Sequence, residues 1–98
     1  MYDIITVGSA TVDALVRTEF YEMVHDKKKK ECIAYPVGAK ILMKELILTT
    51  GGGGTNSAVA LSRLGHKVAF LGKVGSKYNS SRVIEELKRE KVDTSLII

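Results

Sequence analysis

The apolar positions fall into short blocks whose spacing predicts alternating strands and helices. Residues 3–7 are largely apolar and β-branched and end at Gly8, which is typical of a strand buried on both faces of a parallel sheet. Residues 67–71 repeat this pattern before Gly72, and residues 96–98 indicate the beginning of a third core strand. Together with the intervening helices, this order predicts an α/β fold with right-handed crossovers.

Two helices are predicted beside these strands. Thr55 or Asn56 can cap a helix over residues 57–64, which Gly65 ends. Its buried stripe would consist of Ala58, Leu61 and Leu64.

A second helix is predicted from a cap at Asn79 or Ser80 to about Lys91. Its exposed face would carry an i,i+4 pair of Glu85 with Arg89. Its apolar face would be formed by Val83, Ile84 and Leu87.

Residues 14–50 interrupt the alternation and predict a small antiparallel excursion. Residues 14–20 and 41–50 have the composition of strands, whereas the charged residues 22–31 separate them. Pro36 and Gly38 lie so close together that they indicate a turn.

Length and composition then limit the class of protein. With 98 residues, 45% hydrophobic and 27% charged, the chain fits one small packed domain and not a disordered or fibrous protein. No apolar stretch approaches the roughly 20 residues that cross a membrane, and the N-terminus lacks the basic start and apolar run of a secretory signal. We therefore expect a cytoplasmic protein.

Charge and metal-binding residue types point to few partners. The formal charge of +4 suits anionic ligands weakly, and the basic run of residues 27–30 lies between Asp26 and Glu31 without interleaved aromatic residues. This pattern favours a solvated loop over a nucleic-acid surface. The single Cys32 cannot form an internal disulfide, and two scattered histidines give no zinc-ligand spacing, so no metal site is predicted.

The run of four glycines at residues 51–54 is the strongest local signal. A strand, a glycine turn and a helix N-terminus would gather backbone N–H groups and the positive end of a helix dipole, which favours oxygen-rich or anionic ligands. The run matches neither the P-loop nor the dinucleotide pattern, because Thr55 and Asn56 stand where lysine and glycine are required.

Two polar residues near this turn suggest a polyol ligand. Asp13 follows the first core strand and can accept hydrogen bonds from two neighbouring hydroxyls, while Asn56 carries both a donor and an acceptor. Each also has a purely structural alternative, as a turn-stabilising carboxylate and as a helix cap respectively. The combination with Gly51 and Gly52 favours sugar binding.

At these residues the sequence resembles the ribokinase-like (PfkB) family of carbohydrate and nucleoside kinases. The resemblance rests on Val7-Gly8 with Asp13 five residues on, on the stretch GGGGTNSAVALSRLG at residues 51–65, and on GKVG at residues 72–75. It departs from the family pattern at Lys77 and Ser80, where members often carry an acidic residue and a glycine. Lys73 and Lys77 are expected to face solvent instead of a phosphate.

The resemblance implies the N-terminal part of a three-layer α/β/α fold with a mainly parallel sheet. Asp13, Gly51, Gly52 and Asn56 would hold the hydroxyls of the acceptor, and residues 14–50 would form most of a β-sheet lid and a homodimer interface. ATP and Mg²⁺ are implied for a complete enzyme. The family's second signature, with its catalytic aspartate and anion hole, is absent, so no catalytic residue is assigned and the 98 residues alone should be inactive.

Three functions follow as alternatives. The first is the acceptor-binding and lid portion of an ATP-dependent kinase that phosphorylates a hydroxymethyl group of a sugar or nucleoside. The second is a non-catalytic sugar- or nucleotide-binding module. The third, a small basic nucleic-acid binder, depends only on the lysine run.

Overall fold

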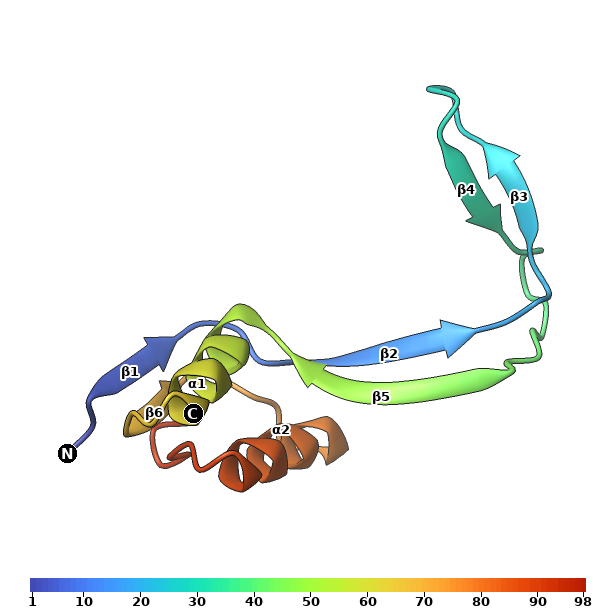
Figure 1. Ribbon diagram of the computed structural model, residues 1–98. Coiled ribbons are helices and arrows are strands. Elements are labelled where there is room, and N and C mark those ends of the chain that lie inside the picture. The colour runs from blue at the N-terminus through green and yellow to red at the C-terminus, as the bar shows by residue number, and fades with distance from the viewer. The chain divides into compact units, whose positions relative to one another are not determined.

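The computed structural model describes residues 1–98 and divides into two units (Figure 1). Unit 1 comprises Met1–Asp13 and Leu48–Ile98, and unit 2 comprises Ala14–Ile47. Neither helix is long and apolar enough to cross a membrane. The elements in chain order are β1 (Ile4–Val7), β2 (Thr11–Arg17), β3 (Glu22–His25), β4 (Glu31–Ala34), β5 (Glu45–Gly51), α1 (Gly53–Arg63), β6 (Val68–Leu71) and α2 (Tyr78–Arg89).

Unit 1 contains a parallel strand pair and both helices, which confirms the predicted α/β class. β1 pairs with β6 in parallel, with Ile4 opposite Val68 and Val7 opposite Leu71. α1 lies between the two strands in sequence, as a parallel connection requires. The buried core joins these elements and consists of Ala58, Val68, Phe70, Val83, Leu87 and Val92.

The prediction that β1 is buried on both faces is wrong for this chain. Successive side chains of a strand point to opposite faces, so Ile5 and Val7 share the face opposite Thr6. Thr6 is buried, whereas Ile5 and Val7 are 48% and 72% exposed. This face of the strand pair is therefore open at Ile5 and Val7, although Ala69, opposite Ile5 on β6, is fully buried.

The third core strand predicted at residues 96–98 does not form. The segment after α2 meets β6 through a single parallel bridge between Ala69 and Asp93. Asp93 then accepts a hydrogen bond from the Ser95 N–H through its carboxylate, which makes a turn where the strand would continue. Ile98 returns to the backbone of Gly72, to whose carbonyl its N–H donates over 2.9 Å.

Both helices begin earlier than the capping residues predicted. α1 begins at Gly53 with Gly52 at the N-cap position, so Thr55 and Asn56 lie inside the first turn. The predicted buried stripe is partly wrong as well. Ala58 is fully buried, as predicted, but Leu64 is 75% exposed.

α2 begins at Tyr78 after Lys77 and has no side-chain cap, so neither Asn79 nor Ser80 has the predicted role. It ends at Arg89, two residues before the predicted Lys91. The predicted ion pair is also displaced, because Arg89 bonds Glu86 three residues earlier, at 2.7 Å, instead of Glu85.

The C-terminal ends of the two helices are linked by hydrogen bonds. Arg63 at the end of α1 donates from both its Nε and Nη2 to the carboxylate of Glu90, and the Nε distance is 2.8 Å. Ser62 donates to the Glu90 carbonyl over 2.7 Å. The hydrogen bond from Arg63 is the main reason why the pKa of Glu90 lies below its usual value.

Unit 2 contains the antiparallel hairpin of β3 and β4, in which Glu22 is opposite Ala34. Residues 22–25 and the segment that begins at Glu31 therefore form strands within the charged stretch, which the sequence analysis did not predict. At the hairpin tip the Asp26 carboxylate accepts hydrogen bonds from the N–H groups of Lys28 and Lys30, so the lysine run is an ordered turn. The predicted turn at Pro36 to Gly38 is present, with a positive φ of 74° at Gly38.

β2 pairs with β5, and both strands continue from one unit into the other. They extend over Thr11–Arg17 and Glu45–Gly51, where residues 14–20 and 41–50 were predicted. At their unit 1 ends they supply Asp13 and Gly51, two of the four predicted site residues.

Candidate functional site

The glycine turn is the place where the loop after β1 crosses the start of α1. A Cβ atom on Gly54 would lie 2.8 Å from the backbone carbon of Gly8 and 2.6 Å from Cε2 of Phe70. A Cβ on Gly8 would in turn lie 3.0 Å from the Gly54 nitrogen. Two backbones therefore cross in direct contact above the buried Phe70 ring, which only glycine at both positions allows.

Gly52 makes the change of direction between β5 and α1. Its φ is 104° and its ψ is 144°, a conformation that residues with a side chain rarely adopt. A Cβ there would also lie 2.5 Å from the carbonyl oxygen of Ser9. Glycine is required at this position on two independent grounds.

Ser9 occupies the first N–H groups of α1. Its hydroxyl accepts a hydrogen bond from the Gly53 N–H at 3.1 Å, and its carbonyl accepts from Gly54 at 3.1 Å and Thr55 at 3.3 Å. The expectation that these N–H groups are free for an anionic ligand is therefore wrong. Local sequence patterns do not identify Ser9 as the residue that bonds the start of α1, because Ser9 lies 44 residues before Gly53.

Asp13 and Gly51 are brought together by the pairing of β2 with β5. A Cβ on Gly51 would lie 2.7 Å from Oδ2 of Asp13 and 3.2 Å from Oγ1 of Thr11. The missing side chain of Gly51 thus provides the space that the Asp13 carboxylate occupies. Gly51 is buried, whereas Asp13 is exposed.

Asn56 lies on the other side of the turn, in the first turn of α1, and its side chain is exposed. Its backbone N–H donates to the Gly52 carbonyl over 2.9 Å. No hydrogen bond joins its side chain to Asp13. The hydroxyls that bond the turn come from other residues, namely Thr6, Ser9, Thr55 and Ser57.

The residues next to the glycine turn thus expose one carboxylate, of Asp13, and one carboxamide, of Asn56, to solvent. A carboxylate can accept two hydrogen bonds, and an amide can donate and accept. These are the groups that bind vicinal hydroxyls, and the bare turn would let such a ligand approach the backbone.

Two features bear on metal and phosphate binding by these residues. No group of three or more carboxylate, histidine or cysteine side chains lies close enough together to hold a metal ion. The N–H groups at the start of α1 that would suit a phosphate are occupied by Ser9.

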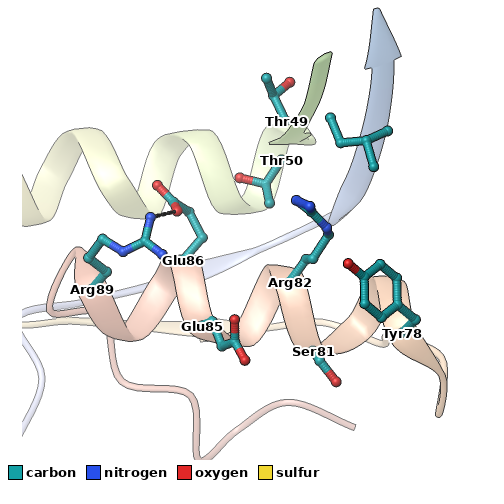
Figure 2. Close-up of a pocket in the computed structure, with 9 residues that line it drawn as sticks. Thr49, Thr50, Tyr78, Ser81, Arg82, Glu85, Glu86 and Arg89 are labelled. Atoms are coloured by element: carbon teal, nitrogen blue, oxygen red, sulfur yellow. Dashed lines mark hydrogen bonds and ion pairs between the residues drawn. The ribbon is translucent and has the colours of Figure 1, made fainter. Parts of the chain in front are cut away.

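Unit 1 also contains a cavity of about 570 Å³, which is lined by none of the four predicted site residues (Figure 2). The Arg82 guanidinium lies 5.6 Å from the centre of the Tyr78 ring, and Arg89 pairs with Glu86. The charged groups that line it, Arg82, Glu85, Glu86 and Arg89, carry two positive and two negative charges. This cavity could not be predicted from the sequence, because Thr49 and Thr50 of β5 line it from a distant part of the chain.

Comparison with known proteins places the chain in a family. The sequence profile of pfkB family carbohydrate kinases matches residues 5–98. The chain belongs to the pfkB family of carbohydrate kinases. This confirms the resemblance inferred from Asp13, the glycine run and the GKVG segment.

Individual pfkB relatives agree with this assignment. The chain is 32% identical to a ribokinase of Bacillus subtilis over 94 residues, which are 96% of this chain and 28% of that protein. It is 47% identical to a 5-dehydro-2-deoxygluconokinase of Clostridium botulinum over 47 residues, 48% of this chain and 14% of that one.

A solved structure shows that the fold is that of the ribokinase-like kinases. The structure of Arabidopsis thaliana ribokinase complexed with ribose and ATP matches 95% of this chain and 26% of its own, with a TM-score of 0.73 and 22% identity. The chain thus spans about a quarter of the length of such relatives.

Proposed function

We propose that residues 1–98 form the acceptor-binding part of an ATP-dependent kinase that phosphorylates a hydroxymethyl group of a sugar or nucleoside. The observation that carries this proposal is the exposed Asp13 carboxylate, seated over Gly51 beside a turn without side chains. The names of two relatives, ribokinase and 5-dehydro-2-deoxygluconokinase, favour a sugar over a nucleoside. ATP as the donor is supported by the plant ribokinase complexed with ribose and ATP.

The role of these residues would be to bind and orient the acceptor. Asp13 would accept hydrogen bonds from two neighbouring hydroxyls, and Asn56 would donate to or accept from a third. Gly51 and Gly52 would let the ring of the acceptor contact the backbone. Phosphoryl transfer depends mostly on positioning and on stabilising charge, so an acceptor held in this way supplies one half of what catalysis requires. The 98 residues by themselves should have no kinase activity.

We also propose that residues 14–50 form most of a lid that excludes water from the transferring phosphoryl group. Unit 2 has its own hairpin, and many of its apolar side chains are exposed, among them Leu15, Phe20, Met23 and Ile33. Apolar surface of this kind can be buried against a second copy. Light scattering should therefore give a homodimer, and a monomer at micromolar concentration would contradict this part of the proposal. A cytoplasmic location would supply the ATP.

The acceptor role is tested by Asp13→Ala in a full-length kinase that contains residues 1–98. Leaving substrate hydroxyls unpaired costs about 1–3 kcal/mol, so the KM for the acceptor should rise roughly 5- to 150-fold while the KM for ATP is unchanged. The matched control is Glu85→Ala, which removes an exposed carboxylate from α2 and should leave both constants unchanged.

Unchanged acceptor binding by the Asp13→Ala protein would refute the assignment. Sugar binding without phosphoryl transfer in the wild-type protein would favour a non-catalytic binding module instead.

A further inference from the structure

The four glycines of the turn have no side chains to hold them, yet most of their polar groups are bonded by hydroxyls. Thr55 donates from Oγ1 to the Gly51 carbonyl at 2.6 Å and is 3.2 Å from the Gly52 carbonyl. Thr6 of β1 donates to the Gly54 carbonyl at 2.9 Å. As described above, the Ser9 hydroxyl accepts from the Gly53 N–H.

Two of these hydroxyls are buried. Thr6 is 9% exposed and Thr55 is 4% exposed, and they are the buried polar residues of the chain. A buried hydroxyl costs free energy unless it is hydrogen-bonded, and valine has nearly the same shape without that cost. Packing alone would therefore be served by valine at either position, which points to a role for the hydroxyls.

The bonds of Thr55 reach the two glycines that border the acceptor-binding groups. Gly51 provides the space for the Asp13 carboxylate, and the Gly52 carbonyl also accepts the N–H of Asn56. If the backbone of residues 51–54 could rotate freely, the Asp13 carboxylate and Asn56 would not keep fixed positions, because glycine has more backbone freedom than any other residue. Small displacements of positioning groups lower the rate of transfer strongly.

We propose that Thr55, with Thr6 and Ser9, acts as a positioning residue that fixes the glycine turn and thereby sets Asp13 and Asn56 for the acceptor. This inference rests on the proposed function. None of the three hydroxyls needs to touch the acceptor, since each is already bonded to the backbone of the turn.

The test compares Thr55→Val with Thr55→Ser in a full-length kinase that contains residues 1–98. Valine keeps the shape and removes the hydroxyl, so kcat/KM for the acceptor should fall at least 10-fold with the KM for ATP unchanged. Serine keeps the hydroxyl and should restore most of the activity. Ser62→Ala is the matched control, because that hydroxyl bonds the Glu90 carbonyl at the other end of α1 and its loss should leave kcat/KM unchanged.

A Thr55→Val protein with wild-type constants for the acceptor would overturn the inference, and so would a loss that Thr55→Ser shares. If Thr55→Val does not fold, Thr6→Val decides by the same criteria. Asp13→Ala in the same assay separates the two proposals. An impaired Asp13→Ala protein beside a normal Thr55→Val protein refutes the positioning role alone, whereas a normal Asp13→Ala protein refutes the acceptor site itself.

Discussion

Replacing Gly52 and Gly53 one at a time by alanine makes the same chemical change at adjacent positions with opposite expected effects. At Gly52 the alanine must adopt a φ near 104°, which costs about 1–3 kcal/mol, and its Cβ meets the Ser9 carbonyl oxygen at 2.5 Å. At Gly53 no atom lies within 4 Å of the new Cβ. Because Gly53 is the first residue of α1, alanine there should be neutral or stabilise by up to about 1 kcal/mol.

The two variants should therefore differ by roughly 1–4 kcal/mol in the free energy of unfolding. In a domain of this size 1 kcal/mol moves the melting temperature by about 4–8 °C, so the midpoints should lie at least about 4 °C apart. Thermal unfolding followed by circular dichroism, at equal protein concentrations, measures this difference. Equal midpoints for the two variants would refute the assignment of backbone strain to Gly52.

Three further predictions concern other parts of unit 1. Gly51→Ala should keep the fold and raise the KM for the acceptor, because its Cβ meets side-chain atoms that can move, Oδ2 of Asp13 at 2.7 Å and Oγ1 of Thr11 at 3.2 Å; kinetics and a melting curve on one preparation check both. Leu87→Ala should cost about 2–5 kcal/mol in urea unfolding, because Leu87 is 1% exposed in the core, and a loss below 1 kcal/mol would contradict that packing. Arg63 lowers the pKa of Glu90, so this ion pair stabilises the fold above the usual glutamate pKa and the stabilisation is lost as the pH falls through the lowered value. Glu90→Gln should weaken this dependence in unfolding curves between about pH 5 and 2, and an identical pH profile would count against it.

The sequence predicted the order of strands and helices in unit 1 because hydrophobic spacing is a local signal. Residues 3–7 and 67–71 were recognised as strands, and the structure places β1 and β6 there to within a residue. Both helices were found from their apolar positions, and Val83 and Leu87 are indeed buried. The family was recognised from the glycine run and its neighbours, which are also contiguous in sequence.

What the sequence did not predict depends on contacts between distant residues. α1 begins inside the glycine run, where helix propensity is lowest, because Ser9 and Thr6 bond its first turn from another part of the chain. The same contacts occupy the N–H groups that were expected to favour an oxygen-rich or anionic ligand. Leu64 has the right spacing for the core and is exposed, since α1 ends at Arg63 and Leu64 is the C-cap residue that follows.

The predicted site residues depend partly on local sequence signals and partly on contacts between distant residues. Asp13 and Asn56 were proposed from residue type and position alone, and the structure leaves both side chains exposed to solvent. The contact between Asp13 and Gly51 arises from the pairing of β2 with β5, across 38 residues, which spacing along the chain does not reveal. Thr55 was read as a helix cap, and its bonds to two glycine carbonyls became apparent only in three dimensions.

The central claim is tested most directly by the crystal structure of a full-length kinase that contains residues 1–98, determined with a bound acceptor. The distances to be measured are those from the Asp13 carboxylate oxygens and the Asn56 carboxamide to the hydroxyls of the acceptor. Hydroxyls within about 2.5–3.2 Å of both side chains, with the acceptor against Gly51 and Gly52, are the predicted result. An acceptor bound elsewhere, with Asp13 in contact only with water, would contradict it.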